Sequence, residues 1–349
     1  MKKTASAVTK PGKRDLLRVL QPVAAAVLVT VLAAYLFQPH WFQLGIGPKK
    51  ILLPLNAILA AMGGYVVTRR WISSFDASLL AGVIYGFGAL GLSFIKYHFT
   101  AGLCYAIVPW LLCPAVYYHP GHSGGAAKTI ISSLLTLMPF AAIAGLFWIA
   151  SHHWAGPLFL MPKYRILEIS DLRGLITPMT FASQPMAIGF YHVPLIMILM
   201  GLFVFAVSGR ETLLLPVLVG VTLSLLGPIL DVTPIIWLSF PALFLSVMAG
   251  LGIQAMAWAG KADRFWIGLC VLAALLLSGF NYMLSLSNPQ SAPYVHAAWL
   301  FIVSAAGVGV IFLLASKSIR LTWLRWIILF GLCVYDIVMT SPALVDSLF

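Results

Sequence analysis

The chain has 349 residues, of which 61% are hydrophobic and 9% are charged, and its mean hydropathy is +1.00. A soluble globular domain carries charge on about a quarter of its residues, so this composition excludes that class and indicates a protein whose solvent is the lipid bilayer. The net charge of +12 does not by itself indicate a nucleic-acid partner, because a membrane protein distributes its basic residues according to its topology.

The first predicted membrane span follows a basic N-terminal tail. Residues Met1–Arg18 contain six Lys and Arg residues, and the apolar run Val19–Phe37 comes directly after them. A signal peptide is the competing interpretation. However, the run has about the 20 residues that a bilayer requires, and no small-x-small cleavage site follows it. We therefore expect residues 1–18 to be a cytoplasmic tail and the apolar run to cross the membrane.

Ten further apolar runs predict ten further spans. No repeat period, low-complexity tract or soluble domain separates them, so the pattern predicts an all-α polytopic membrane protein with about eleven transmembrane helices. We expect one transmembrane domain, residues 19–338, with a longer outer-face loop, residues 151–185, and a short outer tail, residues 339–349. The runs are approximately Ile51–Thr68, Ala77–Phe94, Thr100–Tyr118, Thr129–Ala150, Met186–Val207, Thr212–Leu230, Ile235–Ala257, Phe265–Tyr282, His296–Ser316 and Trp323–Val338.

The distribution of basic residues predicts the orientation. If the N-terminus is inside, the inner tail and connections hold fifteen Lys and Arg residues and the outer connections hold six. Cytoplasmic connections of membrane proteins carry the excess of basic residues, so we expect an inner N-terminus and an outer C-terminus. Glycines in the predicted spans, Gly82 and Gly86 and again Gly250 and Gly252, indicate places where helices approach closely.

The outer loop holds the main candidate site. Glu168 and Asp171 are three residues apart, which on a helix places both carboxylates on one face. Lys163 and Arg165 precede them and Arg173 follows, so the set offers acid and base groups together with cations for a phosphate. The alternative is a short amphipathic helix on the membrane surface whose charges pair with one another.

Three residues outside this loop extend the candidate site. Asp231 lies at the outer end of the seventh predicted span and is a third candidate catalytic carboxylate. Lys96 and His98 follow the third span and are expected at the mouth of a cleft, where they would contact a lipid phosphate or another substrate. All three residues are predicted on the same side of the membrane as the loop, so we include them in the candidate site.

The cysteines, the histidines and one serine motif do not predict a functional site. The four cysteines fall inside apolar runs, so neither a disulfide framework nor a metal knuckle is predicted. The eight histidines lie mostly toward the outer half, but no pair has a diagnostic ligand spacing, and we predict no metal site. The segment Gly121–Gly125 matches G-x-S-x-G, yet it lies in a short inner loop and not on a strand-to-helix elbow, so we interpret it as a flexible turn.

Two segments resemble a known superfamily. Leu53–Val116, with Leu55–Arg70, Asp76–Tyr85 and then Pro109, is similar to the early spans of GT-C-type membrane glycosyltransferases and of the related YfhO-like bacterial membrane proteins. Ile188–Ala257, which ends in the run from Phe240 to Gly252, looks like a later segment of the same proteins. Together they cover about a third of the chain.

The resemblance implies an enzyme of the bacterial cytoplasmic membrane that transfers a sugar from a polyprenyl-phosphate carrier. Such enzymes use an acidic residue of the first outer loop to activate the acceptor or to hold a divalent metal ion. Here that loop, Gln38–Lys50, contains no Asp or Glu. The arginine often found near the later proline is also missing, because the segment reads Trp237-Leu238-Ser239-Phe240-Pro241.

Three functions therefore stay open. The first is a glycosyltransferase relative or a catalytically degenerate member, and the second is a non-catalytic subunit of a larger membrane complex. The third is a transporter, for which Asp76 and Asp336 near span ends are the available charges. We expect membrane lipids, a polyprenyl-phosphate carrier and partner membrane subunits as partners, with no nucleic acid. We also expect that the isolated chain does not turn over polyprenyl-linked sugars, and that its outer surface docks a partner or a lipid.

Overall fold

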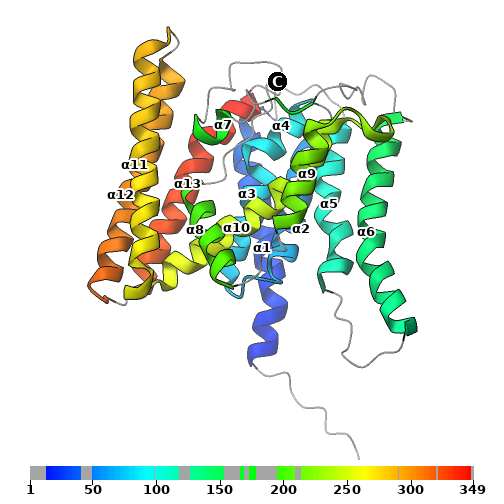
Figure 1. The fold of residues 1–349 in the computed structure, drawn as a ribbon, viewed down its shortest axis with the longest axis horizontal. Coiled ribbons are helices and arrows are strands. Elements are labelled where there is room, and N and C mark those ends of the chain that lie inside the picture. Colours follow the sequence, from blue (N-terminus) through cyan, green and yellow to red (C-terminus); the bar gives the residue numbers. More distant parts are fainter. Residues whose placement is uncertain are drawn as a thin grey trace, which may run out of the picture.

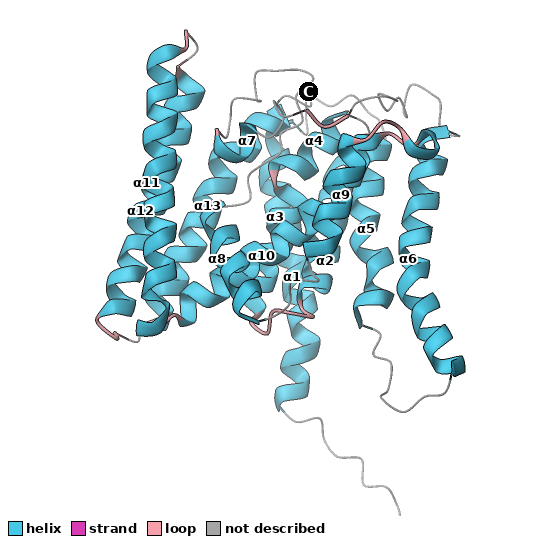
Figure 2. Ribbon diagram, in the orientation of Figure 1, coloured by secondary structure: helices cyan, strands magenta, loops and turns pink. Residues whose placement is uncertain are grey.

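The described part of the protein is entirely helical. The computed structural model describes residues 13–40, 49–97, 99–117, 126–152, 166–168, 173–177, 195–208, 214–289, 291–319 and 321–346. Within these ranges the chain forms α-helices, short 3-10 turns and loops, and no strand (Figure 2). The prediction of an all-α protein is confirmed.

The described part of the chain contains long helices and a few short ones. The long ones pack side by side, with α1 to α5 and α10 at the centre of the view, the α11–α12 hairpin at one flank and α6 at the other (Figure 1). Their bounds are α1 Lys13–Phe37, α2 Lys49–Thr68, α3 Phe75–Phe87, α4 Ala89–Tyr97, α5 Phe99–Tyr117, α6 Ala126–His152, α7 Arg173–Ile176, α8 Leu195–Ser208, α9 Leu215–Leu225, α10 Ser239–Trp258, α11 Arg264–Ser287, α12 Ala292–Ser316 and α13 Thr322–Asp346. Short 3-10 turns are η1 Gln38–His40, η3 Ile229–Asp231, η4 Pro234–Leu238 and η5 Lys261–Asp263.

Seven membrane spans are supported by length and composition within the described ranges. They are Leu20–Phe37, Ile51–Thr68, Phe75–Phe94, Pro234–Trp258, Lys261–Ser287, Ala292–Ser316 and Thr322–Pro342. Four shorter apolar helices overlap the other four predicted runs and lie at Ala101–Tyr117, Leu137–Ser151, Leu195–Ser208 and Leu215–Leu225. The start of α1 and the end of α13 lie at opposite ends of the molecule in Figure 1.

The third predicted span differs from a single straight helix. It is divided into α3 and α4 at Gly88, whose backbone is extended with ψ 159°. The break frees the carbonyl oxygen of Phe87, which accepts a hydrogen bond of 2.9 Å from the Ser341 hydroxyl of α13. A polar backbone group inside a membrane must be satisfied by the protein, so this serine makes the break tolerable. It lies on the part of α13 that continues past the predicted end at Val338.

Close helix packing at glycines is confirmed. A Cβ atom on Gly82 or Gly86 of α3 would collide with the backbone of α2 at Ala61 and Ala57. A Cβ atom on Gly252 of α10 would overlap the carbonyl oxygen of Met197 on α8. Lipid tails are as apolar as leucine, so close van der Waals packing at small residues is a main source of helix association in a membrane.

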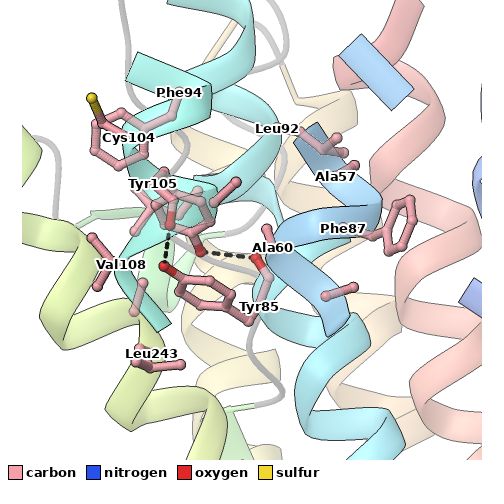
Figure 3. Close-up of a cluster of buried hydrophobic side chains, with 14 of the residues drawn as sticks. Ala57, Ala60, Tyr85, Phe87, Leu92, Phe94, Cys104, Tyr105, Val108 and Leu243 are labelled. Atoms are coloured by element: carbon pink, nitrogen blue, oxygen red, sulfur yellow. Dashed lines mark hydrogen bonds between the residues drawn. The ribbon is translucent and has the colours of Figure 1, made fainter. Parts of the chain in front are cut away.

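Two tyrosines join α3 to α5 in the core. The Tyr85 hydroxyl donates to the carbonyl of Tyr105, and the Tyr105 hydroxyl donates to the carbonyl of Tyr85, both at 2.8 Å. Their rings stack with centroids 4.2 Å apart, and Phe94 of α4 stacks on Tyr105 at 5.3 Å. Figure 3 shows the two rings face to face among apolar side chains. Both buried hydroxyls are thereby satisfied.

Arginines hold helix ends together at the end of the molecule where α1 starts. Arg325 of α13 is buried and donates to the carbonyls of Ala259, which caps α10, and Ile319, 3.0 Å away. Arg69, just after α2, donates to Gln21 of α1 at 3.1 Å and to the carbonyl of Ser73 at 2.8 Å. Cations near helix C-termini interact favourably with the helix dipole.

Candidate functional site

The predicted outer loop is described at two places. Residues 166–168 are not helical, and the Leu167 amide donates to the carbonyl of Ser224, near the end of α9, at 2.8 Å. Glu168 is exposed beside this attachment. Residue 168 is not helical, and Asp171 lies outside the described residues, so the relation of Glu168 and Asp171 on one helical face stays a prediction.

The second described place is the short helix α7. The side-chain amide of Asn281, on α11, donates to the carbonyl of Ile176 at 2.7 Å. The loop is thus attached to α9 at one point and to α11 at the other. Arg173 is the first residue of α7, and Lys96 lies in the last turn of α4. The remaining predicted site residues, His98, Lys163, Arg165 and Asp171, lie outside the described residues, as does the Gly121–Gly125 segment.

Asp231 occupies a sharp corner after α9. It ends the 3-10 turn η3 and has a φ of 56°, in the left-handed region that a residue with a side chain seldom adopts. Its side chain is exposed, and η3 packs against α6. Because Leu167 is bonded to the end of α9 and Asp231 follows that end closely, the structure brings Glu168 and Asp231 to the same end of α9.

Beside this corner lies an apolar groove that the sequence did not reveal. The groove has a volume of about 540 Å³ and runs between α6 and α9 over the start of α10. Four of the side chains that line the groove are exposed: Leu137 by 64%, Phe140 by 37%, Leu215 by 61% and Val219 by 46%. It is lined by Leu137, Phe140, Ala141, Ala144, Leu215, Pro216, Val219, Leu223, Trp237 and Phe240. The open side of the groove is therefore bordered by exposed apolar side chains.

Aromatic rings form the wall between the groove and the core. Phe140 of α6 stacks on Phe240 of α10 with centroids 5.8 Å apart, and Trp237 of η4 lies 6.2 Å from Phe240. Phe147, buried one turn beyond the groove on α6, meets Trp237 edge to face at 5.1 Å. These stacked rings hold α6 against η4 and α10 while the space between α6 and α9 stays open.

Two hydroxyl-bearing residues, Ser151 and Thr233, lie beyond the groove toward the C-terminal end of α6. On α6 the lining residues Leu137 and Ala144 are followed, at helical spacing, by Phe147 and then by Ser151. Ser151 donates to the carbonyl of Phe147 at 2.8 Å and accepts the amide of Thr233 at 3.3 Å. Ser151 and Thr233 are therefore joined near the C-terminal end of α6, and η3, which ends in Asp231, packs against the same helix.

The two charges considered for transport differ in their surroundings. Asp76 is exposed in the first turn of α3. Asp336 is 5% exposed in α13, between Cys333, which belongs to one apolar cluster, and Ile337, which belongs to the other. Within the part of the chain that the structure describes, no three His, Cys, Asp or Glu side chains gather closely enough to hold a metal ion.

These observations define a class, the helical integral membrane proteins, because long apolar helices dominate the described chain and their outward faces are apolar. Comparison with known proteins does not narrow this class further. No family model, no curated protein and no solved structure matches the chain.

Proposed function

We propose that this protein binds a lipid of the polyprenyl-phosphate class, with its tail in the groove between α6 and α9 and its head beside Asp231 and Glu168. The observation that carries the proposal is the groove itself, whose lining residues are all apolar, while the chain beyond its walls α6 and α9 carries Ser151 and Asp231. This arrangement matches the division of such a lipid into an apolar chain and a polar head, and because the phosphate and the two carboxylates carry charge of the same sign, a divalent metal ion would have to bridge them. The GT-C-like resemblance of the sequence agrees with this lipid class and is part of the proposal.

The proposal includes the finer topology. We place eleven crossings in the bacterial cytoplasmic membrane, with the N-terminus inside and the C-terminus outside. The four shorter apolar helices support the count, and the opposite positions of the start of α1 and the end of α13 support an odd number of crossings. The arginines that join helix ends lie at the end where α1 starts, as the excess of positive charge on the inner side requires.

A groove in a membrane protein is filled by some lipid chain whatever its function, since tails and apolar side chains attract each other equally. Selection of one lipid must therefore come from the shape of the groove and from polar groups at its end. The described groups there are two carboxylates and two hydroxyls. If the protein is catalytic, Glu168 and Asp231 are placed to accept a proton from an acceptor or to hold a divalent metal ion, and a degenerate relative would keep only the binding.

A membrane-complex subunit and a transporter remain the alternatives. The transporter is favoured by one observation, the burial of Asp336 between the two apolar clusters. Ionisable residues inside membrane proteins commonly mark transport paths. A subunit is distinguished by purification in mild detergent, because it would require its partners whereas a lipid-binding protein would be isolated alone.

Filling the groove tests the proposal. Ala144 lines the groove, whereas Ala142, two residues earlier on the same helix, is exposed and lies outside it. Ala144→Trp should weaken binding of a polyprenyl phosphate to the purified protein in nanodiscs by about tenfold or more, because the indole occupies the volume of the tail. Ala142→Trp should leave binding unchanged. Equal binding by both variants and the wild type would refute the proposal.

A further inference from the structure

Two adjacent arginines follow the last turn of α2 and join three helix ends. Arg69 donates to the carbonyl of Ser73 at 2.8 Å and to the side-chain oxygen of Gln21, on α1, at 3.1 Å. Arg70 donates through its Nε atom to the carbonyl of Val116, near the end of α5, at 3.2 Å. All of these acceptors are neutral, so the bonds position the two guanidinium groups without cancelling their charge.

Both arginines can be reached from outside the helix bundle. Arg70 is exposed and Arg69 is half-buried. Tyr117, the last residue of α5, is 46% exposed, and its hydroxyl donates to the carbonyl of Val66 on α2. Tyrosine and arginine side chains at the end of a membrane helix typically lie at the level of the lipid head groups. The two arginines are therefore placed where a head group can contact them.

An apolar face of α2 leads up to the arginines. Leu55, Leu59, Met62 and Val66 follow one another at helical spacing, which places them on one side of the helix, and the opposite side packs against α3. Leu55 is 39% exposed, and the other three are half-buried. At 1.5 Å per residue this face is about 16 Å long, which is about half the thickness of the hydrocarbon core. Its length therefore fits an acyl chain of one leaflet.

We infer that this face of α2 and the two arginines bind one anionic phospholipid, with its phosphate on Arg69 and Arg70 and an acyl chain along α2. The planar guanidinium fork matches the oxygen atoms of a phosphate, and the resulting charge-assisted hydrogen bonds are stronger than those between neutral groups. In the proposed topology this end of α2 is cytoplasmic, and the cytoplasmic leaflet carries the negative surface charge. The site shares no residue with the groove between α6 and α9 and does not depend on a lipid there.

Removing one arginine tests the head-group contact. Delipidated protein in a nonionic detergent is titrated with phosphatidylglycerol, and native mass spectrometry measures the bound lipid. Arg70→Gln should bind phosphatidylglycerol about tenfold more weakly than the wild type, because a charge-assisted contact is lost. The side chain is exposed, so the variant should stay folded. Phosphatidylcholine, whose head group has no net charge, should bind the wild type more weakly than phosphatidylglycerol.

Arg264→Gln is the matched control for this change of charge. Arg264 is the exposed first residue of α11 and lies at the same end of the molecule (Figure 1). It is not close to the apolar face of α2 in the fold, so Arg264→Gln should keep the wild-type affinity. An equal loss in Arg264→Gln and Arg70→Gln would show that only the overall charge attracts the lipid. That result, or an unchanged affinity of Arg70→Gln, overturns the inference.

Trp110 reports the position of the acyl chain. It is 40% exposed on α5, and its indole N–H donates to the carbonyl of Leu59 at 3.0 Å, so it lies beside the apolar face of α2. Phosphatidylglycerol with brominated chains should quench the fluorescence of the wild type more than that of Trp110→Phe, because bromine quenches nearby indoles. Equal quenching of both would place the chain elsewhere and contradict the inference.

Two further measurements separate this site from other anion and lipid sites. Inorganic phosphate and glycerol phosphate should not displace phosphatidylglycerol, because they lack the chain that lies along α2, and displacement by either would show a site for a soluble anion instead. Ala144→Trp, which fills the groove between α6 and α9, should leave the affinity for phosphatidylglycerol unchanged. A loss of affinity in that variant would assign this lipid to the groove and overturn the α2 site.

Discussion

The packing around α3 and the packing around α6 differ in kind. Residues 77–94 of α3 and α4 are all buried, and the glycines of α3 bring it into backbone contact with α2. On α6, Gly145 has nothing near the position of a Cβ atom, and Leu137 and Met138 are more than half exposed. Both helices are predominantly apolar, so composition does not separate them.

The difference shows how a membrane protein combines closely packed helices with an open groove. Where small residues allow backbones to approach, helices associate by close packing, and where large side chains stand at the interface, a gap remains. Aromatic contacts fix α6 at Phe147 and Phe140, and Ala141 and Ala144 leave room beside them. The helices of the core are thus closely packed, whereas an open groove lies beside α6, where we propose that the lipid tail binds.

Truncating one phenylalanine in each region should give the largest contrast. Phe87 at the end of α3 is fully buried, whereas Phe140 is 37% exposed at the groove. Phe87→Ala should cost about 3–5 kcal/mol of stability, because a core cavity remains. Phe140→Ala should cost about 1 kcal/mol or less, because lipid or detergent fills the space. Steric-trap or denaturant unfolding measures both, and similar losses would contradict the contrast.

The glycines give the next largest effect. Gly252→Ala should destabilise the protein by about 2–3 kcal/mol, because the new methyl group meets the backbone of α8 at Met197 and the helices must separate. Gly145→Ala, its match on α6, should be neutral or slightly stabilising because alanine favours the helix. Thermal unfolding of both variants in one detergent makes the comparison. An unchanged melting temperature of Gly252→Ala would show that α8 and α10 are not in backbone contact at this position.

The tyrosine pair sharpens the description of the core. Tyr85→Phe and Tyr105→Phe each remove one of the two 2.8 Å hydrogen bonds and keep the stacked rings. Each should cost about 1 kcal/mol. Tyr282→Phe, at an exposed position of α11, should cost nothing measurable. A double-mutant cycle between Tyr85 and Tyr105 reports the coupling, and two silent single variants would argue against the bonds.

The smallest expected effect concerns the loop attachment. Asn281→Leu removes the bond to the carbonyl of Ile176 and should change global stability by less than about 1 kcal/mol. The local effect should be larger: hydrogen exchange of residues 173–177 should accelerate, while that of Leu167, which is bonded to α9, stays the same. Equal acceleration at both places would mean that the loop moves as one unit.

The sequence predicted the class and the tight helix contacts but not the groove. Apolar length is a strong signal, and a pair such as Gly82 and Gly86 marks close approach because only glycine permits it. The groove residues of α6, Phe140 and Ala144, are spaced as one helical face, but every face of that helix is apolar, so periodicity cannot single it out.

The predicted site was limited by a different cause. Glu168 and Asp171 were related through helical spacing, whereas the bond from Leu167 to Ser224 joins the loop to a helix more than fifty residues away. No local pattern contains such a contact. Asp231 was noticed only for its place at a span end, and its left-handed backbone depends on the path between α9 and η4.

The central claim, that the groove between α6 and α9 selects a lipid, is tested most directly by photo-crosslinking in cell membranes. A benzophenone amino acid is placed at Val219, which lines the groove, and in a separate protein at Leu276, which is 66% exposed on α11 away from it. Mass spectrometry then identifies the attached lipids. We predict that Val219 captures a single-chain polyprenyl phosphate far above its abundance, while Leu276 captures phospholipids in membrane proportions. The same phospholipid mixture at both positions would contradict the account.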